Sequence, residues 1–124
     1  MFTCPTEKKE ANPKLRLGYL LSHEARGASY VVLWLDCDKE GENICFEVLN
    51  EIKDVIRRPT SGEKVVYRAK FSAITDKDIK MAMNNLVYPN ENESKSVDAR
   101  QELDLRIGRA FTRFQTKFFQ VVWI

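Results

Sequence analysis

The strongest constraint on the fold is a short, unbroken apolar run that ends in an acidic turn. Residues 30–35 read Tyr-Val-Val-Leu-Trp-Leu, and the polar segment 36–41 follows at once. A run of strand-forming residues without alternation is typical of a strand covered on both faces, as in a parallel sheet. A second strand is predicted over 64–71, where apolar and polar residues alternate.

Helices are predicted around these strands. The first begins at Pro13 and stops near Gly27, because proline is tolerated at the first helical position and glycine suits the end. The second carries an apolar stripe within residues 44–56. The third opens after Thr75, which has an acidic residue three positions later, and runs to about Leu86. The order strand, helix, strand, helix predicts an α/β fold with a mostly parallel sheet.

Composition narrows the class of protein. Hydrophobic residues make up 44% of the chain and charged residues 31%, as in a globular protein. The chain has 20 basic and 18 acidic residues, so its charges nearly cancel, and any surface that attracts nucleic acid has to be local. Cys4, Cys37 and Cys45 form no C-x-x-C pair, which favours a reducing compartment over a disulfide framework or a zinc site. No apolar run is long enough to span a membrane, and no signal-peptide pattern is present, so a soluble intracellular protein is expected.

The acidic turn contains three alternating carboxylates, Asp36, Asp38 and Glu40. In an extended segment these side chains point to one side, at the strand end where α/β proteins bind ligands. Oxygen ligands without histidine or thiolate suit Mg²⁺. The alternative is an acidic cap on the helix that begins near Gly41, because carboxylates favour helix N-termini. Spacing alone leaves both hypotheses open.

The C-terminal part is expected to form a loop over 88–96 and a helix over 97–119. One face of this helix is apolar, and a separate basic stripe is expected to be solvated surface. Arg100 and Asp104 lie near the apolar sector, four residues apart. They can pair with each other, or the guanidinium can contact a phosphate while the carboxylate orients it.

Three segments carry a resemblance to a known family. LWLDCDKEGENI (33–44) resembles the D-x-D-x-E segment of the TOPRIM fold, which topoisomerases share with bacterial primases. YRAKFSAIT (67–75) resembles the last TOPRIM strand, and SVDARQELDLRIGRAFTRFQT (96–116) resembles a segment of eukaryotic and archaeal topoisomerase III. The chain is therefore identified as similar to type IA topoisomerases. Two segments favour the beta kind of topoisomerase III: PTEKKEANPKL (5–15) and LDCDKEGENICFEVL (35–49).

The resemblance implies a domain arrangement. An incomplete TOPRIM domain, Rossmann-like and without its first, glutamate-bearing strand, is expected over 1–75. The start of the helical, single-strand-binding domain of the type IA core is expected over 76–120, and an unrelated tail over 121–124. The nucleophilic tyrosine of the family lies in a Y-P-R-T-E segment that none of the four tyrosines here matches. A truncated gene product, inactive on its own, is therefore expected.

The resemblance also implies site residues. Mg²⁺ would be held by Asp36, Asp38 and Glu40, with Glu42 supporting the turn and no catalytic nucleophile in the chain. The implied nucleic-acid contacts, the last three of them weaker, are Arg100, Asp104, Gln101, Arg113 and Gln115.

For the intact enzyme, the resemblance implies transient cleavage, passage and rejoining of single strands through a 5′-phosphotyrosine link. Its implied partners are single-stranded DNA, RNA as a second substrate, and a Tudor-domain scaffold protein. The nucleus is the expected location, with the cytoplasm as a second one. An inactive single-stranded nucleic-acid-binding or regulatory fragment is the alternative. Another TOPRIM enzyme, such as a primase or nuclease, is disfavoured because neither carries the segment SVDARQELDLRIG.

Overall fold

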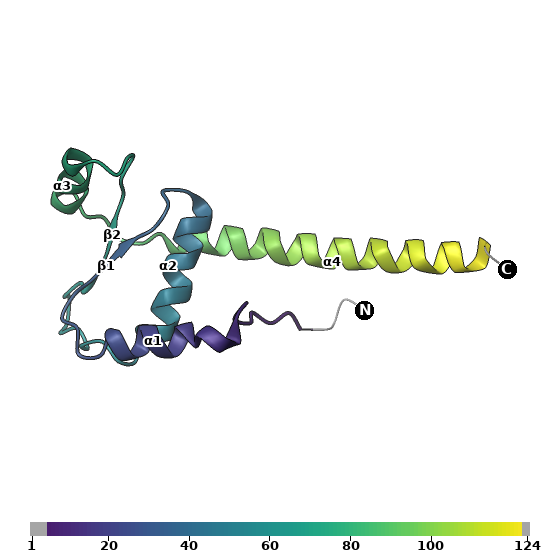
Figure 1. Ribbon diagram of the computed structural model, residues 1–124, viewed down its shortest axis with the longest axis horizontal. Helices are drawn as coiled ribbons and strands as arrows, with labels where there is room; N and C mark the ends of the chain where they lie inside the picture. Colours follow the sequence, from purple (N-terminus) through teal and green to yellow (C-terminus); the bar gives the residue numbers. More distant parts are fainter. Residues whose placement is uncertain (1–4, 123–124) are drawn as a thin grey trace.

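The computed structural model describes residues 5–122, so Cys4 and the last two residues of the expected tail lie outside the described part. Two strands and a series of helices make up this part (Figure 1). Their order along the chain is η1 (Pro13–Leu15), α1 (Leu17–Glu24), β1 (Val31–Trp34), α2 (Lys39–Ile52), β2 (Val66–Ala69), α3 (Asp76–Asn84) and α4 (Glu91–Val122).

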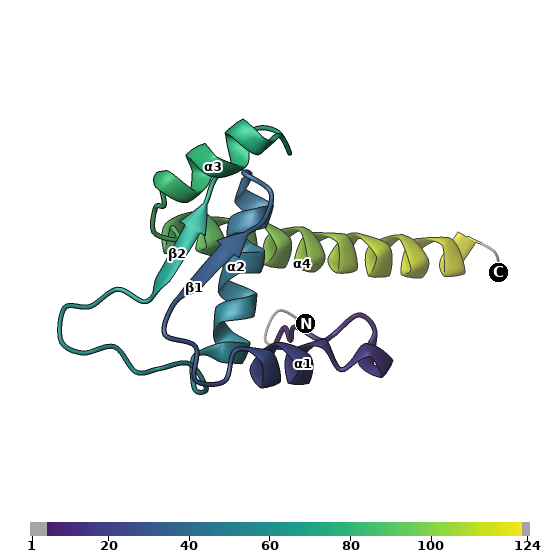
Figure 2. The same ribbon diagram turned by 60° about the vertical axis from the view of Figure 1, so that its left-hand side comes forward.

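The two strands form a parallel sheet, which confirms the predicted α/β class (Figure 2). The register pairs Val31 with Val66 and Trp34 with Ala69. Val87 adds an antiparallel bridge on the other side of β2. The Arg68 N–H donates to the Val87 carbonyl at 2.7 Å, and the Val87 N–H donates back at 3.0 Å. This bridge was not anticipated, and it occupies part of the edge of β2 that faces away from β1.

β1 is covered on one face only, so the prediction of a strand buried on both faces is wrong for the described chain. Leu33 is the buried residue of β1, whereas Trp34 is 36% exposed and the preceding Tyr30 is 59% exposed. Side chains alternate along a strand, and register partners share a face. Leu33 therefore shares its face with its partner Arg68, whose side chain reaches α2. Within residues 5–122, no comparable layer buries Tyr30 and Trp34 on the opposite face.

The first predicted helix is interrupted. Pro13 opens a single 3-10 turn, and Arg16 then adopts a left-handed conformation with φ of 47° before α1 begins. The predicted stop near Gly27 agrees with the structure, since α1 ends at Glu24 and Gly27 has φ of 73°. The Gly27 N–H then donates to the Val55 carbonyl at 2.9 Å, which ties this turn to the end of α2.

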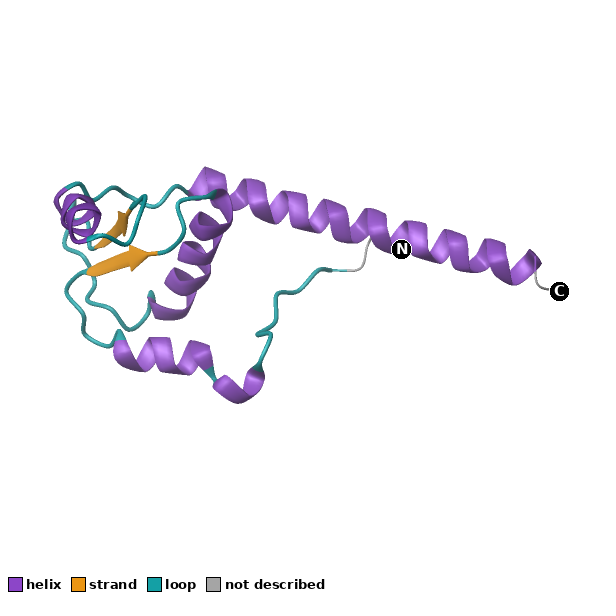
Figure 3. Ribbon diagram, turned by 45° about the horizontal axis from the view of Figure 1, so that its top comes forward, coloured by secondary structure: helices purple, strands orange, loops and turns teal. Residues whose placement is uncertain are grey.

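α2 lies between two other helices and organises the fold. Its N-terminal end contacts α4 and its C-terminal end lies by α1 (Figures 1 and 3). Cys45 and Ile52 are buried on its inner side. The helix ends at Ile52, so Val55 and Ile56 of the predicted stripe belong to the following turn. α3 begins after Thr75 as predicted, with the Asp78 N–H donating to the threonine hydroxyl at 3.2 Å.

α4 begins earlier than predicted, because the expected loop over 88–96 is largely helical. Asn90 caps the helix: its side-chain oxygen accepts from the N–H groups of Asn92 at 3.1 Å and Glu93 at 3.4 Å. Ser94 and Val97 in the first turns are buried. The helix has 32 residues and is about 48 Å long, so it extends far beyond the body (Figure 1).

The distal part of α4 carries the predicted apolar face in an exposed state. Leu103, Ile107, Phe111, Phe114 and Phe118 are each more than half exposed. Among the described helices, none is long and apolar enough to cross a membrane.

Candidate functional site at the acidic turn

The acidic turn connects the end of β1 to the start of α2. Asp38 caps α2, because its carboxylate accepts a hydrogen bond from the Gly41 N–H at 2.7 Å. Gly41 packs against the turn so closely that a Cβ there would lie 2.0 Å from the Asp36 carbonyl oxygen. The helix-cap hypothesis is thus confirmed for Asp38, and the turn tolerates no side chain at position 41.

Glu40 joins the acidic turn to α4. Its carboxylate pairs with the Arg100 guanidinium at 2.5 Å, although the two residues are 60 positions apart. The structure therefore brings one predicted metal residue and one predicted nucleic-acid residue into direct contact. The alternative pair between Arg100 and Asp104 does not form, and Asp104 makes no ion pair within the described part of the chain.

Asp36 is the least constrained carboxylate of the turn. Its side chain is exposed and has no hydrogen-bond or ion-pair partner among the described residues. Across residues 5–122, no three acidic, histidine or cysteine side chains are grouped so that they could hold a metal ion. The three predicted carboxylates are separated because Asp38 turns to the Gly41 N–H and Glu40 to Arg100.

The donor chemistry of Asp36 and Asp38 still suits Mg²⁺. Mg²⁺ is usually held by one or two carboxylates and completes its shell with water and phosphate oxygens. Asp36 offers a free carboxylate, and Asp38 has a second oxygen beyond the one that accepts from Gly41. One oxygen of Glu40 is bound by Arg100.

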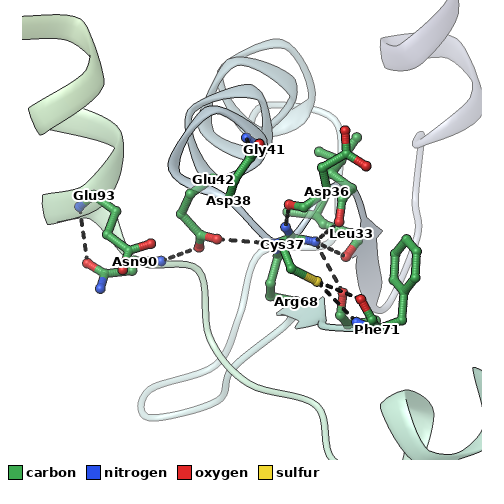
Figure 4. Close-up of polar contacts among 12 residues, drawn as sticks. Leu33, Asp36, Cys37, Asp38, Gly41, Glu42, Arg68, Phe71, Asn90 and Glu93 are labelled. Atoms are coloured by element: carbon green, nitrogen blue, oxygen red, sulfur yellow. Dashed lines mark hydrogen bonds and ion pairs between the residues drawn. The ribbon is translucent and has the colours of Figure 1, made fainter. Parts of the chain in front are cut away.

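A buried arginine lies directly beneath the turn, and sequence reasoning missed it. Arg68 of β2 is fully buried, and its guanidinium faces the end of β1 (Figure 4). Nη1 donates to the carbonyl oxygens of Leu35 at 2.8 Å, Ala69 at 3.1 Å and Leu33 at 3.3 Å. Nη2 donates to the carbonyl oxygen of Asp36. The sequence did contain a signal for this role: Arg68 is a charged residue at an inward-facing position of a strand in which apolar and polar residues alternate.

Glu42 completes this network and is also buried. One carboxylate oxygen accepts from Arg68 Nε at 3.2 Å, and the other accepts from the Asn90 N–H at 2.6 Å (Figure 4). Beside it, the Ser94 hydroxyl donates to the Asn43 side-chain oxygen at 2.9 Å. The expectation that Glu42 supports the turn is therefore confirmed, and its second contact reaches the start of α4.

The other predicted nucleic-acid residues are distributed along α4. Gln101 lines a groove of about 340 Å³ together with Thr6 and Lys8 of the N-terminal segment. Arg113 and Gln115 are exposed and lie 13 and 15 residues beyond Arg100, which is about 20 Å along the helix axis. The structure therefore does not bring them together with Arg100.

The N-terminal segment is held by Lys8. Its ammonium pairs with Asp98 of α4 at 2.6 Å and with Glu47 of α2 at 2.9 Å. Partial burial alone would lower the pKa of Lys8, but the hydrogen bonds to the two carboxylates outweigh it and raise the pKa. No local sequence signal predicts this contact, since Asp98 lies 90 positions from Lys8.

The two described cysteines differ in environment. Cys37, in the acidic turn, is exposed, and its sulfur lies 3.0 Å from the Phe71 carbonyl oxygen and 3.2 Å from the Phe71 nitrogen. Cys45 is buried in α2, and burial raises the pKa of its thiol. Cys37 therefore contacts the backbone of Phe71, two residues after β2.

Comparison with known proteins gives a consistent family. The Toprim domain model matches residues 1–74. The chain is 70% identical over 120 residues to DNA topoisomerase 3-beta of Drosophila melanogaster, which covers 97% of the chain and 14% of the fly protein. It is 66% identical over 117 residues to human DNA topoisomerase 3-beta-1 (94% and 14%). It is 48% identical over 103 residues to human DNA topoisomerase 3-alpha (83% and 10%). The chain thus spans only a small part of the relatives' length.

Proposed function

Because this chain belongs to the Toprim family, we propose that it supplies the acidic turn and part of the strand-binding surface of a type IA topoisomerase. In such an enzyme a tyrosine attacks a phosphodiester, one strand is held by a 5′-phosphotyrosine link, another strand passes, and the break is resealed. The substrate would be single-stranded DNA. Support for this reaction class comes from relatives whose names identify them as DNA topoisomerases.

The observation that carries the proposal is the contact between Glu40 and Arg100. A cluster of carboxylates repels a phosphate, whereas a guanidinium binds one. An arginine within 2.5 Å of the acidic turn therefore offers a phosphate an anchor next to the residues that fit Mg²⁺. The two side chains are 48% and 59% exposed, so both are accessible to a ligand from solvent.

The roles proposed for the chain's own residues follow from this arrangement. Asp36 and Asp38 would hold Mg²⁺, which would stabilise charge on the phosphate during phosphoryl transfer. Arg100 would leave Glu40 and pair with a backbone phosphate of the bound strand. Glu40 would then be free to act as a further oxygen ligand at this site.

We propose that four further residues of α4 extend the nucleic-acid surface: Gln101, Asp104, Arg113 and Gln115.

Three expectations stay predictions from the resemblance: binding of RNA, a Tudor-domain scaffold partner, and a nuclear or cytoplasmic location.

The metal part of the proposal is tested with Asp36→Asn together with Asp38→Asn in the complete gene product. Asparagine keeps the shape and the helix cap but removes both negative charges. We expect the double variant to lose Mg²⁺-dependent strand rejoining. Glu51→Gln together with Asp54→Asn, which removes two exposed carboxylates at and just beyond the far end of α2, is the matched control and should keep it. Rejoining at the wild-type magnesium concentration in the double variant would mean that the turn is only a helix cap.

The strand-binding part is tested with Arg100→Gln and a single-stranded oligonucleotide. The binding constant for a single strand falls as the salt concentration rises. Loss of one phosphate contact should make the plot of log binding constant against log salt concentration less steep by about 0.7. Arg109→Gln, an exposed position on the same helix, removes the same charge and should leave the slope unchanged. Equal effects of the two substitutions would indicate that Arg100 contributes only to the general charge of α4.

A further inference from the structure

We infer that Arg68 and Glu42 are positioning residues for the acidic turn, and that they also fix the turn relative to α4. The inference rests on the proposed function, because its consequence is the geometry of the metal-binding carboxylates. Neither side chain is accessible to a ligand: Arg68 is 0% and Glu42 1% exposed. Their effect would therefore be exerted through the backbone that they hold.

Arg68 takes the place of strand pairing beyond the end of β1. β1 ends at Trp34, and the backbone from Leu35 to Asp38 belongs to no strand or helix. Arg68 binds the carbonyl oxygens of Leu35 and Asp36 in this segment. Five donors in a rigid, planar group allow a single arginine to satisfy several carbonyls at once. The backbone that carries the Asp36 carboxylate is thus fixed by a side chain of the neighbouring strand.

Glu42 extends the same constraint to α4. Its two oxygens are shared between Arg68 and the Asn90 N–H. Asn90 in turn caps α4 through its side chain. The start of the helix that carries Arg100 is therefore linked to the acidic turn by a continuous series of hydrogen bonds. This link would set the distance between the metal-binding carboxylates and Arg100.

Stability alone is a weak reason for a buried charge pair such as Arg68 and Glu42. Replacement of buried ion pairs by apolar residues is often neutral or stabilising, since desolvation offsets much of their attraction. Every buried polar side-chain atom in the described part has a partner, so the network is complete. A complete buried network specifies one arrangement of the backbone around it. Here that backbone is the acidic turn.

The test uses Arg68→Lys in the complete gene product. Lysine keeps the positive charge, but its compact ammonium cannot form the planar set of bonds to Glu42 and to the turn carbonyls. We expect the Kd for Mn²⁺, measured by electron paramagnetic resonance as a probe for the Mg²⁺ site, to rise about tenfold, as for other residues that orient metal ligands. Without metal, amide exchange over residues 35–38 should become faster.

A control separates positioning from general loss of stability. Ile52→Val removes one methylene from a buried position at the far end of α2. We expect this variant to unfold at a lower temperature while its Kd for Mn²⁺ and its exchange over residues 35–38 match the wild type. Wild-type Mn²⁺ affinity and exchange in Arg68→Lys would overturn the inference.

A second variant decides the matter if Arg68→Lys does not fold. Glu42→Gln has only one acceptor oxygen, so it loses either the bond from Arg68 or the bond from the Asn90 N–H. A raised Kd for Mn²⁺ in this variant supports the inference, and an unchanged Kd overturns it.

The double variant Asp36→Asn with Asp38→Asn is measured alongside to distinguish the inference from the proposed metal site. If this double variant binds Mn²⁺ normally, the proposed metal site is wrong, and the inference is wrong with it. If the pair loses binding while the Arg68 and Glu42 variants keep it, the inference alone fails.

Discussion

Substitution of Gly41 by alanine should destabilise the protein more than any exposed change on the same helix. The added Cβ would lie 2.0 Å from the Asp36 carbonyl oxygen, 2.8 Å from its carbonyl carbon and 3.2 Å from its nitrogen. All three are backbone atoms, so no side-chain rotation relieves the contact. Either the start of α2 or the acidic turn has to move.

The expected magnitude follows from two terms. Insertion of a methyl group into a packed site costs about 1–3 kcal/mol, and rigid backbone favours the upper part of that range. The Gly41 N–H is also the donor to the Asp38 cap, and loss of an N-cap costs about 1 kcal/mol. We therefore expect Gly41→Ala to lower the free energy of unfolding by about 3 kcal/mol.

Urea denaturation followed by tryptophan fluorescence measures this change. The chain has two tryptophans, and a Trp123→Phe background leaves Trp34, whose ring centroid lies 5.6 Å from that of Phe71. With an m-value of about 1.5 kcal/mol/M, the midpoint should fall by about 2 M.

Gly108→Ala is the matched control for this substitution. No atom lies within 4 Å of a Cβ added at Gly108, which is in the exposed part of α4. Alanine favours a helix over glycine by about 1 kcal/mol, so the midpoint should stay at or above the wild-type value. A wild-type midpoint for Gly41→Ala would refute the close contact between Gly41 and the turn. An equal fall in both variants would show that the loss does not come from that contact.

The remaining predictions concern the helix cap, the thiols and one surface carboxylate. Asp38→Ala should lower the free energy of unfolding by about 1 kcal/mol, whereas Asp38→Asn keeps a capping oxygen and should change it little; equal losses in urea denaturation would contradict the cap. In a Cys4→Ser background, Ellman's reagent should label exposed Cys37 first and buried Cys45 only after denaturation, and equal rates would show that Cys45 is accessible. Hydrogen bonds from the Thr60 hydroxyl and the Arg57 guanidinium lower the pKa of Glu63 below its ordinary value. The stabilisation from this carboxylate is therefore present above the ordinary pKa and is lost as the pH falls through the folded-state pKa. The difference in thermal midpoint between the wild type and Glu63→Gln should accordingly shrink on acidification, and a constant difference would contradict this.

Local sequence signals predicted the elements that depend on neighbouring residues. The parallel pairing of β1 follows from its unbroken apolar run, and the start of α3 follows from the hydroxyl of Thr75. The cap of α2 was one of two hypotheses for Asp38, and the hydrogen bond from Gly41 confirms it. The two caps join partners three positions apart, so spacing alone contains the information. The strand pairing joins residues 35 positions apart, and it was predicted from the residue types of the apolar run.

The early start of α4 could also have been predicted, but other signals obscured it. Asn90 is followed three residues later by Glu93, which resembles a capping box, and Pro89 precedes it. The same segment is rich in turn-forming residues, which favoured a loop. Burial of Ser94 against Asn43 stabilises the helical alternative, and that contact joins residues 51 positions apart.

The sequence by itself determined the family and the α/β class, and it predicts which carboxylates suit Mg²⁺, because these depend on residue type and short spacing. Tertiary structure alone decided how those carboxylates are used. It separated Asp36, Asp38 and Glu40, paired Glu40 with Arg100, and placed Arg68 beneath the turn. These contacts join residues 30 or more positions apart in the chain, apart from the helix cap. No periodicity or local spacing encodes such a contact, because it depends on how strands and helices pack once they have formed.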